Sequence, residues 1–274
     1  MPNRLDATFA ALKARREAAL VTYVAAGDPF PTVEKTARVV LALAEAGADV
    51  VELGIPYSDP MADGPTIQAA TQRALDAGVN PPFVFDVVRR VRRESQTPIV
   101  LMGYYNNVLR IGLARFAQEM ADAGADGVIL SDLPPEEADP WKTEADARKI
   151  ATIFLLAPTS TPERIDAVVS DMNSGFVYCV SRTGVTGVQR DVPEDLHRLV
   201  TSIKNKTNLP VCVGFGISTR EHVKQVSSIS DGVVIGSRLV EALRSNAGSA
   251  EWETTIRKMV SEWKSGTTTK ENHV

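Results

Sequence analysis

Short runs of apolar, often β-branched residues alternate along this chain with longer segments whose apolar residues recur every three or four positions. The short runs are typical of buried parallel strands, and the longer segments of amphipathic helices that cover them. The predicted strands span residues 20–26, 50–53, 99–102, 127–130, 150–156, 175–180, 211–215 and 232–235. The predicted helices cover residues 32–46, 66–77, 83–94, 112–123, 135–147, 162–171, 194–205, 219–228, 238–245 and 250–264. Eight such strands are the number that closes an α/β (βα)8 TIM barrel.

The pattern predicts more helices than eight βα units need. Leu5, Phe9 and Leu12 recur at helical spacing before the first strand, and additional helical segments follow the second and eighth strands. We therefore expect one TIM-barrel domain over residues 1–264, with an extra N-terminal helix and extra helices at these two places. The polar residues 265–274 are predicted to form a disordered tail. An open doubly wound sheet is the competing architecture, but no Gly-x-Gly-x-x-Gly turn follows the first strand.

The net charge and the hydropathy of the chain indicate which kinds of molecule it is not expected to bind. The chain has 274 residues, of which 44% are hydrophobic and 23% charged, and its formal net charge is -4. Without a long basic run, nucleic acid is not expected as a partner. The N-terminus lacks the apolar core of a secretory signal, and no apolar run is long enough to span a membrane. These features predict a cytoplasmic protein that does not bind membranes.

A carboxylate inside an apolar strand is the first candidate for chemistry. Alternation along residues 50–53 places Glu52 on the same face as Val50. If that face points into the barrel, burial raises the pKa of Glu52 and makes it able to give and take a proton near neutral pH. The alternative is a structural glutamate that forms an internal salt bridge.

Two further acids follow in the next loop. Asp63 comes just before the helix predicted from residue 66, so it is either a functional carboxylate or the helix N-cap. Asp59, between Ser58 and Pro60, is more simply a turn residue.

Glycines at two strand ends indicate a site for an anion. The seventh strand ends in Gly214, Phe215 and Gly216, and the eighth is followed by Gly236 and Ser237. Glycine lets backbone N–H groups approach an anion closely, and the following helix adds the positive end of its dipole. The loops after strands seven and eight commonly hold phosphate in such barrels. Close packing or tight turns are the alternative reason for these glycines.

The sixth strand leads into a loop with the sequence YCVSRTGVTGVQRD at residues 178–191. A loop with glycines at 184 and 187 is able to act as a lid, and the N–H of Gly187 could close onto the same phosphate. Tyr178 would reach the barrel interior, where it hydrogen-bonds a substrate or simply packs. A long surface loop without a role in catalysis is the other interpretation.

The residues that are missing also limit the chemistry. No lysine ends a predicted strand, which disfavours a Schiff-base aldolase. The three histidines lack the spacing of a zinc site, so neither a metal nor a cofactor is expected. Carbon–carbon chemistry would then depend on carboxylates and on a substrate that serves as its own electron sink, as an indole ring can.

The chain resembles the family of tryptophan synthase α subunits from Phe9 to about Trp263. Four separated motifs carry the resemblance: VELGIPYSDPMADG at 51–64, Tyr178 with SRTGVTG at 181–187, GFGIS at 214–218 and IGS at 235–237. The resemblance implies a βα barrel that cleaves indole-3-glycerol phosphate to indole and glyceraldehyde 3-phosphate in a retro-aldol reaction, which makes it a lyase of L-tryptophan biosynthesis.

The resemblance also implies roles for individual residues. Glu52 matches the acid and base that protonates indole C3, and Asp63 matches the carboxylate that holds the indole N–H. The other matched positions line the substrate pocket, bind its phosphate or belong to the lid: Tyr23, Tyr178, Thr186, Gly187, Gly216, Gly236 and Ser237. Tyr23 stands where phenylalanine is frequent, and Arg238 where a small residue is frequent.

A partner follows from the same resemblance. The family's usual partner is a pyridoxal-phosphate β subunit, which receives indole through a tunnel in an α2β2 heterotetramer. Residues 56–61 and 104–107 would face it. Three alternatives stay open: a stand-alone indole-releasing lyase, a subunit that mainly binds and activates its partner, and a barrel that acts on another phosphorylated metabolite.

Overall fold

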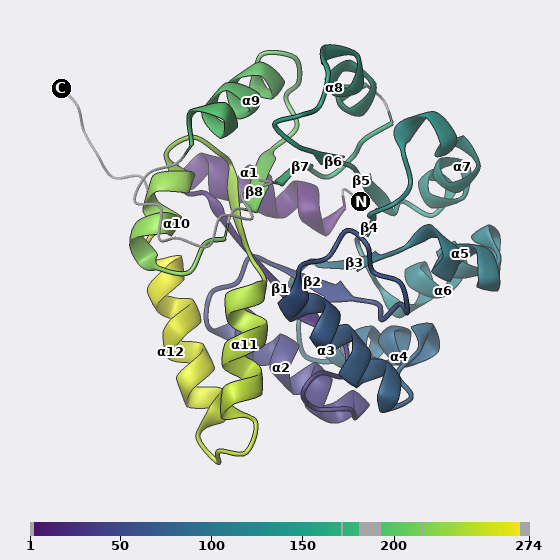
Figure 1. The fold of residues 1–274 in the computed structure, drawn as a ribbon, viewed down its shortest axis with the longest axis vertical. Coiled ribbons are helices and arrows are strands. Elements are labelled where there is room, and N and C mark those ends of the chain that lie inside the picture. The colour runs from purple at the N-terminus through teal and green to yellow at the C-terminus, as the bar shows by residue number, and fades with distance from the viewer. Residues whose placement is uncertain (1–2, 171, 181–192, 215, 269–274) are drawn as a thin grey trace.

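The computed structural model of the chain describes residues 3–170, 172–180, 193–214 and 216–268, which form a barrel of strands inside a ring of helices (Figure 1). All strand pairs are parallel, in the order β5-β4-β3-β2-β1-β9-β8-β7-β6. The strands are β1 Ala19–Ala25, β2 Val50–Gly54, β3 Ile99–Gly103, β4 Gly127–Leu130, β5 Ala151–Ile153, β6 Leu155–Leu156, β7 Val177–Val180, β8 Val211–Gly214 and β9 Gly232–Ile235. The predicted TIM barrel is confirmed.

The ends of this order, β5 and β6, are consecutive in the chain and separated only by Phe154. The prediction of one unbroken strand over residues 150–156 is therefore wrong. At Phe154 the backbone N–H donates to the Asn173 side-chain oxygen at 2.8 Å, where a continuous strand would bond its neighbour. A polar side chain distant in sequence thus replaces one bond of the ladder where the barrel closes.

The helices pack outside the barrel and, apart from α5 at Tyr105–Ile111 and a 3-10 turn in the segment predicted as one helix over 135–147, follow the predicted order. They are α1 Arg4–Arg15, α2 Val33–Glu45, α3 Pro65–Asp76, α4 Pro81–Arg92, α5 Tyr105–Ile111, α6 Leu113–Ala123, α7 Asp139–Ala147, α8 Pro162–Val169, α9 Glu194–Lys204, α10 Arg220–Ser227, α11 Ser237–Asn246 and α12 Trp252–Lys264, with a 3-10 turn, η1, at Pro135–Glu137. The extra helices after the second and last strands are α4 and α12. No helix within the described ranges is long and apolar enough to cross a membrane.

Helix α5 was not predicted. The side-chain oxygen of Asn107 accepts from the N–H of Tyr104 at 3.2 Å, which supports the first turn of this short helix. Gly112 then separates α5 from α6 with a φ of 94°, a value that favours glycine. The sequence pattern at 105–111 is too short for periodicity to reveal a helix.

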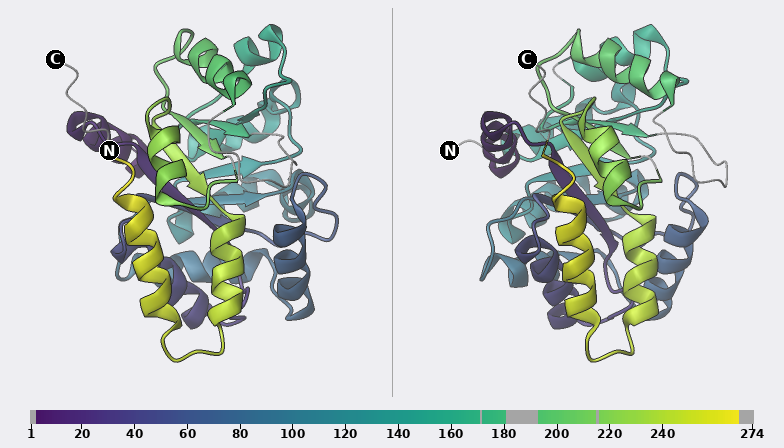
Figure 2. Two further views of the ribbon diagram at one scale, coloured as in Figure 1. Left: turned by 60° about the vertical axis from the view of Figure 1, so that its left-hand side comes forward. Right: turned by 90° about the vertical axis from the view of Figure 1, so that its left-hand side faces the viewer.

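The N-terminal helix α1 closes one end of the barrel (Figure 2). Leu5, Phe9 and Leu12 are buried and belong to the apolar cluster that fills the barrel interior next to α1. The centroid of the Phe9 ring lies 5.8 Å from that of Phe176, the residue just before β7. These apolar side chains close the barrel interior at the α1 end, so the interior residues nearer the C-terminal ends of the strands are the ones that a ligand can reach.

The tail prediction is wrong for residues 265–268. Thr267 is fully buried, and its carbonyl accepts from the N–H of Ala18 at 3.1 Å. Thr268 forms an antiparallel bridge with Glu17. These contacts join residues far apart in sequence, so local composition does not reveal them. Residues 269–274 lie outside the described residues.

Candidate active site

A cavity of about 510 Å³ opens at the C-terminal ends of the strands, opposite α1. The predicted site residues that line it are Tyr23, Glu52, Asp63, Tyr178, Gly214, Gly216, Gly236 and Ser237. Thr186, Gly187 and Phe215, which were also predicted to bind substrate, lie outside the described residues. Strand ends and loops far apart in sequence therefore meet in one cavity, as expected for this face of a TIM barrel.

Glu52 lies in the middle of β2, level with Tyr23 of β1 and Val100 of β3. Its side chain is fully buried, and neither carboxyl oxygen has a hydrogen-bond partner among the described residues. Burial raises the pKa of Glu52 to about 8. An ionised carboxylate without a partner is costly in such a place, so the group holds its proton at neutral pH. The alternative of a structural salt bridge is not supported, since no cation pairs with it in the described part of the chain.

Asp63 is half-buried in the loop between β2 and α3. Burial raises its pKa to about 6, while the neighbouring Tyr104 hydroxyl acts in the opposite direction. The N-cap of α3 is Gly64, and no side-chain hydrogen bond caps this helix. Asp63 is therefore not the cap, and its carboxyl group remains available to a ligand in the cavity.

Tyr104 anchors the loop that carries Asp63, a role the sequence interpretation missed. Its hydroxyl accepts from the N–H of Ala62 at 3.0 Å, and its ring stacks on Tyr57 at a centroid distance of 4.9 Å. The side chain is buried at 5% exposure, directly after β3. Its place at a strand end was the available signal, because such positions form the functional face of the barrel.

Tyr23 and Tyr178 form the inner wall of the cavity. Both are buried, and burial together with the charges of Glu52 and Asp63 raises the pKa of each hydroxyl well above its usual value, so both stay neutral. A Cβ on Gly54 would lie 2.2 Å from the Tyr23 hydroxyl oxygen, and one on Gly214 would lie 2.8 Å from that of Tyr178. Glycine at 54 and 214 thus makes room for the two rings.

This contact supports the packing alternative for Gly214. Gly216 differs, because it has a φ of 42° and an added Cβ would meet nothing within 4 Å. Its backbone conformation, rather than contact with a side chain, favours glycine there.

Part of the remaining lining is apolar and was not predicted. Met102, Leu155 and Val180 line it from the ends of β3, β6 and β7. Alternation along the strands was the available signal, since Val180 lies two residues after Tyr178 and Met102 two residues after Val100. Ser131 lies in the same cavity, and its buried hydroxyl has no partner among the described residues. Such a wall fits a flat apolar ring.

The N-terminus of α11 also lines the cavity. Gly236 is its N-cap, Ser237 is its first residue, and no side chain caps the helix. Its first N–H groups and the positive end of the helix dipole suit an anion. Arg238, also in the cavity lining, forms an ion pair with Glu241 at 3.4 Å.

The described ranges contain no group of three or more histidine, cysteine, aspartate or glutamate side chains placed to hold a metal ion. No lysine is among the described residues that line the cavity. The carboxyl groups of Glu52 and Asp63, with their raised pKa values, can perform acid–base chemistry in this cavity.

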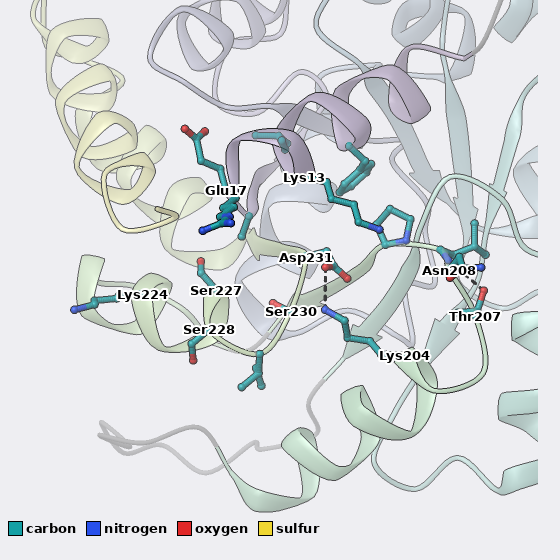
Figure 3. A pocket seen from close by; sticks show the side chains of 17 residues that line it. Lys13, Glu17, Lys204, Thr207, Asn208, Lys224, Ser227, Ser228, Ser230 and Asp231 are labelled. Atoms are coloured by element: carbon teal, nitrogen blue, oxygen red, sulfur yellow. Dashed lines mark hydrogen bonds and ion pairs between the residues drawn. The ribbon is translucent and has the colours of Figure 1, made fainter. Parts of the chain in front are cut away.

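A second cavity, of about 680 Å³, lies at the opposite end of the barrel (Figure 3). It is bounded by α1 and by the ends of α9 and α10. Lys13 in the last turn of α1 and Lys204 in the last turn of α9 complement the negative ends of these two helix dipoles. Lys204 pairs with Asp231 at 2.9 Å. None of the predicted site residues lines this cavity, so its larger volume does not make it the catalytic one.

Comparison with known proteins assigns the family. A family model described as tryptophan synthase alpha chain matches residues 9–268. The alpha chain of Geotalea daltonii is 48% identical over 264 residues, which cover 96% of this chain and 98% of that protein. The alpha chain of Geobacter sulfurreducens is 52% identical over 239 residues, covering 87% and 89%.

Solved structures agree with this assignment. Tryptophan synthase subunit alpha from Legionella pneumophila has a TM-score of 0.89 and 37% identity, covering 97% of this chain and 99% of that chain. A chain of tryptophan synthase from Mycobacterium tuberculosis has a TM-score of 0.89 and 37% identity, covering 98% and 100%. The barrel, the paired carboxyl groups and these matches lead to one conclusion: the chain belongs to the tryptophan synthase alpha chain family.

Proposed function

We propose that the cavity with Glu52 and Asp63 binds indole-3-glycerol phosphate and is the place where it is cleaved. Family membership assigns the reaction: the chain is the α subunit of tryptophan synthase, a lyase that releases indole and glyceraldehyde 3-phosphate. The apolar wall of Met102, Leu155 and Val180 suits the indole ring, and the N-terminus of α11 suits the phosphate. The observation that supports this placement most is the fully buried, unpartnered carboxyl group of Glu52.

In the proposed mechanism, protonated Glu52 gives its proton to indole C3. Positive charge then develops on the indole nitrogen, and ionised Asp63 stabilises it through the N–H. The Glu52 carboxylate next removes the proton of the glycerol hydroxyl next to the ring. The C–C bond breaks, its electron pair restores the aromatic indole, and the hydroxyl carbon becomes the aldehyde. Glu52 ends the cycle protonated, as it began.

We expect kcat/KM to follow a bell-shaped pH profile with limbs near pH 6 and pH 8, from the raised pKa values of Asp63 and Glu52. Below the first limb Asp63 is neutral and no longer offsets the positive charge on indole. Above the second, Glu52 has lost the proton that C3 must receive. Initial rates of indole release between about pH 5 and 9 test this.

The substrate phosphate also titrates at about pH 6. The acidic limb must therefore be absent from the residual activity of Asp63→Asn if Asp63 causes it. A rate that is constant across the range would contradict the assignment of both groups.

We further propose that the surface around Met61 and Leu109 binds a tryptophan synthase β subunit in an α2β2 assembly. These are the most exposed large hydrophobic side chains of the described residues, at 91% and 52%. Met61 lies in the segment 56–61 that was predicted to face the partner, whereas Leu109 lies on α5, two residues after the predicted segment 104–107. The stacked rings of Tyr57 and Tyr104 join the two segments. Because Met61 lies on the same loop as Asp63, a partner bound there is placed where it can affect the active site.

Met61→Lys is expected to weaken binding of the β subunit by about tenfold, since a buried apolar contact is replaced by a charge. Glu262→Lys, on an exposed position of α12, is the matched control. Titration of indole release with β subunit measures both effects. Equal turnover with and without β subunit, and no binding, would instead support a stand-alone lyase.

A further inference from the structure

The ion pair between Arg238 and Glu241 lies at the rim of the catalytic cavity and has no role in the chemistry described above. The Arg238 Nη1 and Glu241 Oε2 atoms are 3.4 Å apart, and the side chains are 48% and 64% exposed. Both residues line the cavity, on the first turns of α11. A pair this long and exposed contributes little to stability, so the guanidinium group is free to exchange its partner at low cost.

The charged side chains that line the cavity are mostly acidic, so a bound phosphate needs a nearby cation. The described lining contains three carboxyl groups, those of Glu52, Asp63 and Glu241. Arg238 is the one lysine or arginine among the lining residues that the structure describes. A phosphate ester, which carries up to two negative charges, would otherwise meet only backbone N–H groups and hydroxyls there.

We propose that Arg238 leaves Glu241 when substrate enters and binds its phosphate, so that Glu241 holds the guanidinium group at the rim of the empty site. This rests on the proposed function, which places the phosphate at the N-terminus of α11 beside Ser237. Arginine presents a planar set of donors that matches two phosphate oxygens, whereas its present contact is with one carboxylate oxygen. The exchange replaces a weak, singly bonded pair with a stronger one.

The test compares four variants of the full chain: Arg238→Gln, Glu241→Gln, the double variant, and Arg244→Gln. Arg244 lies near the exposed end of α11, away from the cavity lining, and is the matched control. Isothermal titration with sn-glycerol 3-phosphate gives the dissociation constant. Kinetics with indole-3-glycerol phosphate and with its phosphate-free analogue, indole-3-glycerol, separate phosphate binding from the other contacts.

Arg238→Gln should raise the dissociation constant of glycerol 3-phosphate by about fivefold to tenfold, the size of a charge-assisted bond reduced by solvent exposure. KM for the phosphorylated substrate should rise in parallel with kcat nearly unchanged, and indole-3-glycerol should react as with the unaltered chain. Glu241→Gln should tighten binding by about twofold, since it removes the competing carboxylate. In the double variant this gain should vanish, because it acts through Arg238.

Each other outcome is decisive. If Arg238→Gln binds glycerol 3-phosphate as tightly as the unaltered chain, or if indole-3-glycerol is affected equally, Arg238 does not bind phosphate. If the unaltered chain releases indole but Arg238→Gln binds glycerol 3-phosphate as tightly as the unaltered chain does, the proposed function stands and the role of Arg238 is wrong. If the unaltered chain neither binds glycerol 3-phosphate nor releases indole, both proposals are wrong.

Discussion

Replacing Glu52 with glutamine is expected to lower kcat for indole release by about three orders of magnitude, the contribution of a positioned acid and base. Glutamine has the same shape but cannot give a proton to indole C3 or accept one from the glycerol hydroxyl. Because Glu52 is fully buried and holds a proton at neutral pH, the substitution leaves no unpaired charge behind. Steady-state assays with saturating indole-3-glycerol phosphate measure the effect.

The same variant should be folded and more stable above neutral pH. The pKa of Glu52 is raised to about 8 in the folded chain, so folding takes up a proton between the unfolded pKa and this value. Wild-type stability should therefore fall, relative to the variant, as pH rises through that window. Denaturant unfolding at several pH values measures the difference, with Glu262→Gln on the surface of α12 as control. A folded Glu52→Gln chain with substantial activity would overturn the role of Glu52.

Asp63→Asn is expected to lower kcat by about two orders of magnitude, as when one electrostatic contact to a transition state is removed. The amide keeps a hydrogen-bond acceptor but lacks the negative charge that offsets the cationic indole nitrogen. Asp59→Asn, two residues before Met61 in the same loop, is the matched control and should keep its turnover in the isolated chain.

Tyr104→Phe provides an independent readout of the same group. Because the Tyr104 hydroxyl lowers the pKa of Asp63, its removal should shift the acidic limb of the pH profile to a higher pH. It also removes the acceptor for the N–H of Ala62. An unmoved limb in Tyr104→Phe, or full turnover in Asp63→Asn, would mean that Asp63 does not act on the indole N–H.

The local pattern of apolar and polar residues was enough to predict which side chains of a strand face the barrel interior. Alternation along β2 correctly placed Glu52 on the interior face, because the side-chain period of a strand is fixed by its geometry. The barrel followed from eight strands and their covering helices, and the strand ends identified the face with the cavity. The family resemblance, rather than periodicity, supplied the indole substrate and moved Asp63 from helix cap to ligand.

The features that were missed depend on contacts between distant residues. Gly54 is needed because Tyr23, on the neighbouring strand, occupies the space of a Cβ. The strand break at Phe154 depends on Asn173, and the order of Thr267 depends on Ala18. No local composition encodes these pairs, because each residue alone fits several conformations.

The central claim is that Glu52 holds a proton inside the barrel at neutral pH and transfers it to the substrate. A carbon-13 NMR titration of the glutamate carboxyl groups, with the Glu52 signal identified by its absence from Glu52→Gln, tests the first half of this claim directly. We predict that this signal titrates near pH 8, well above an ordinary glutamate at about 4.3. A signal that titrates at or below the ordinary value would show that Glu52 is ionised at neutral pH, and would contradict its role as the acid that protonates indole.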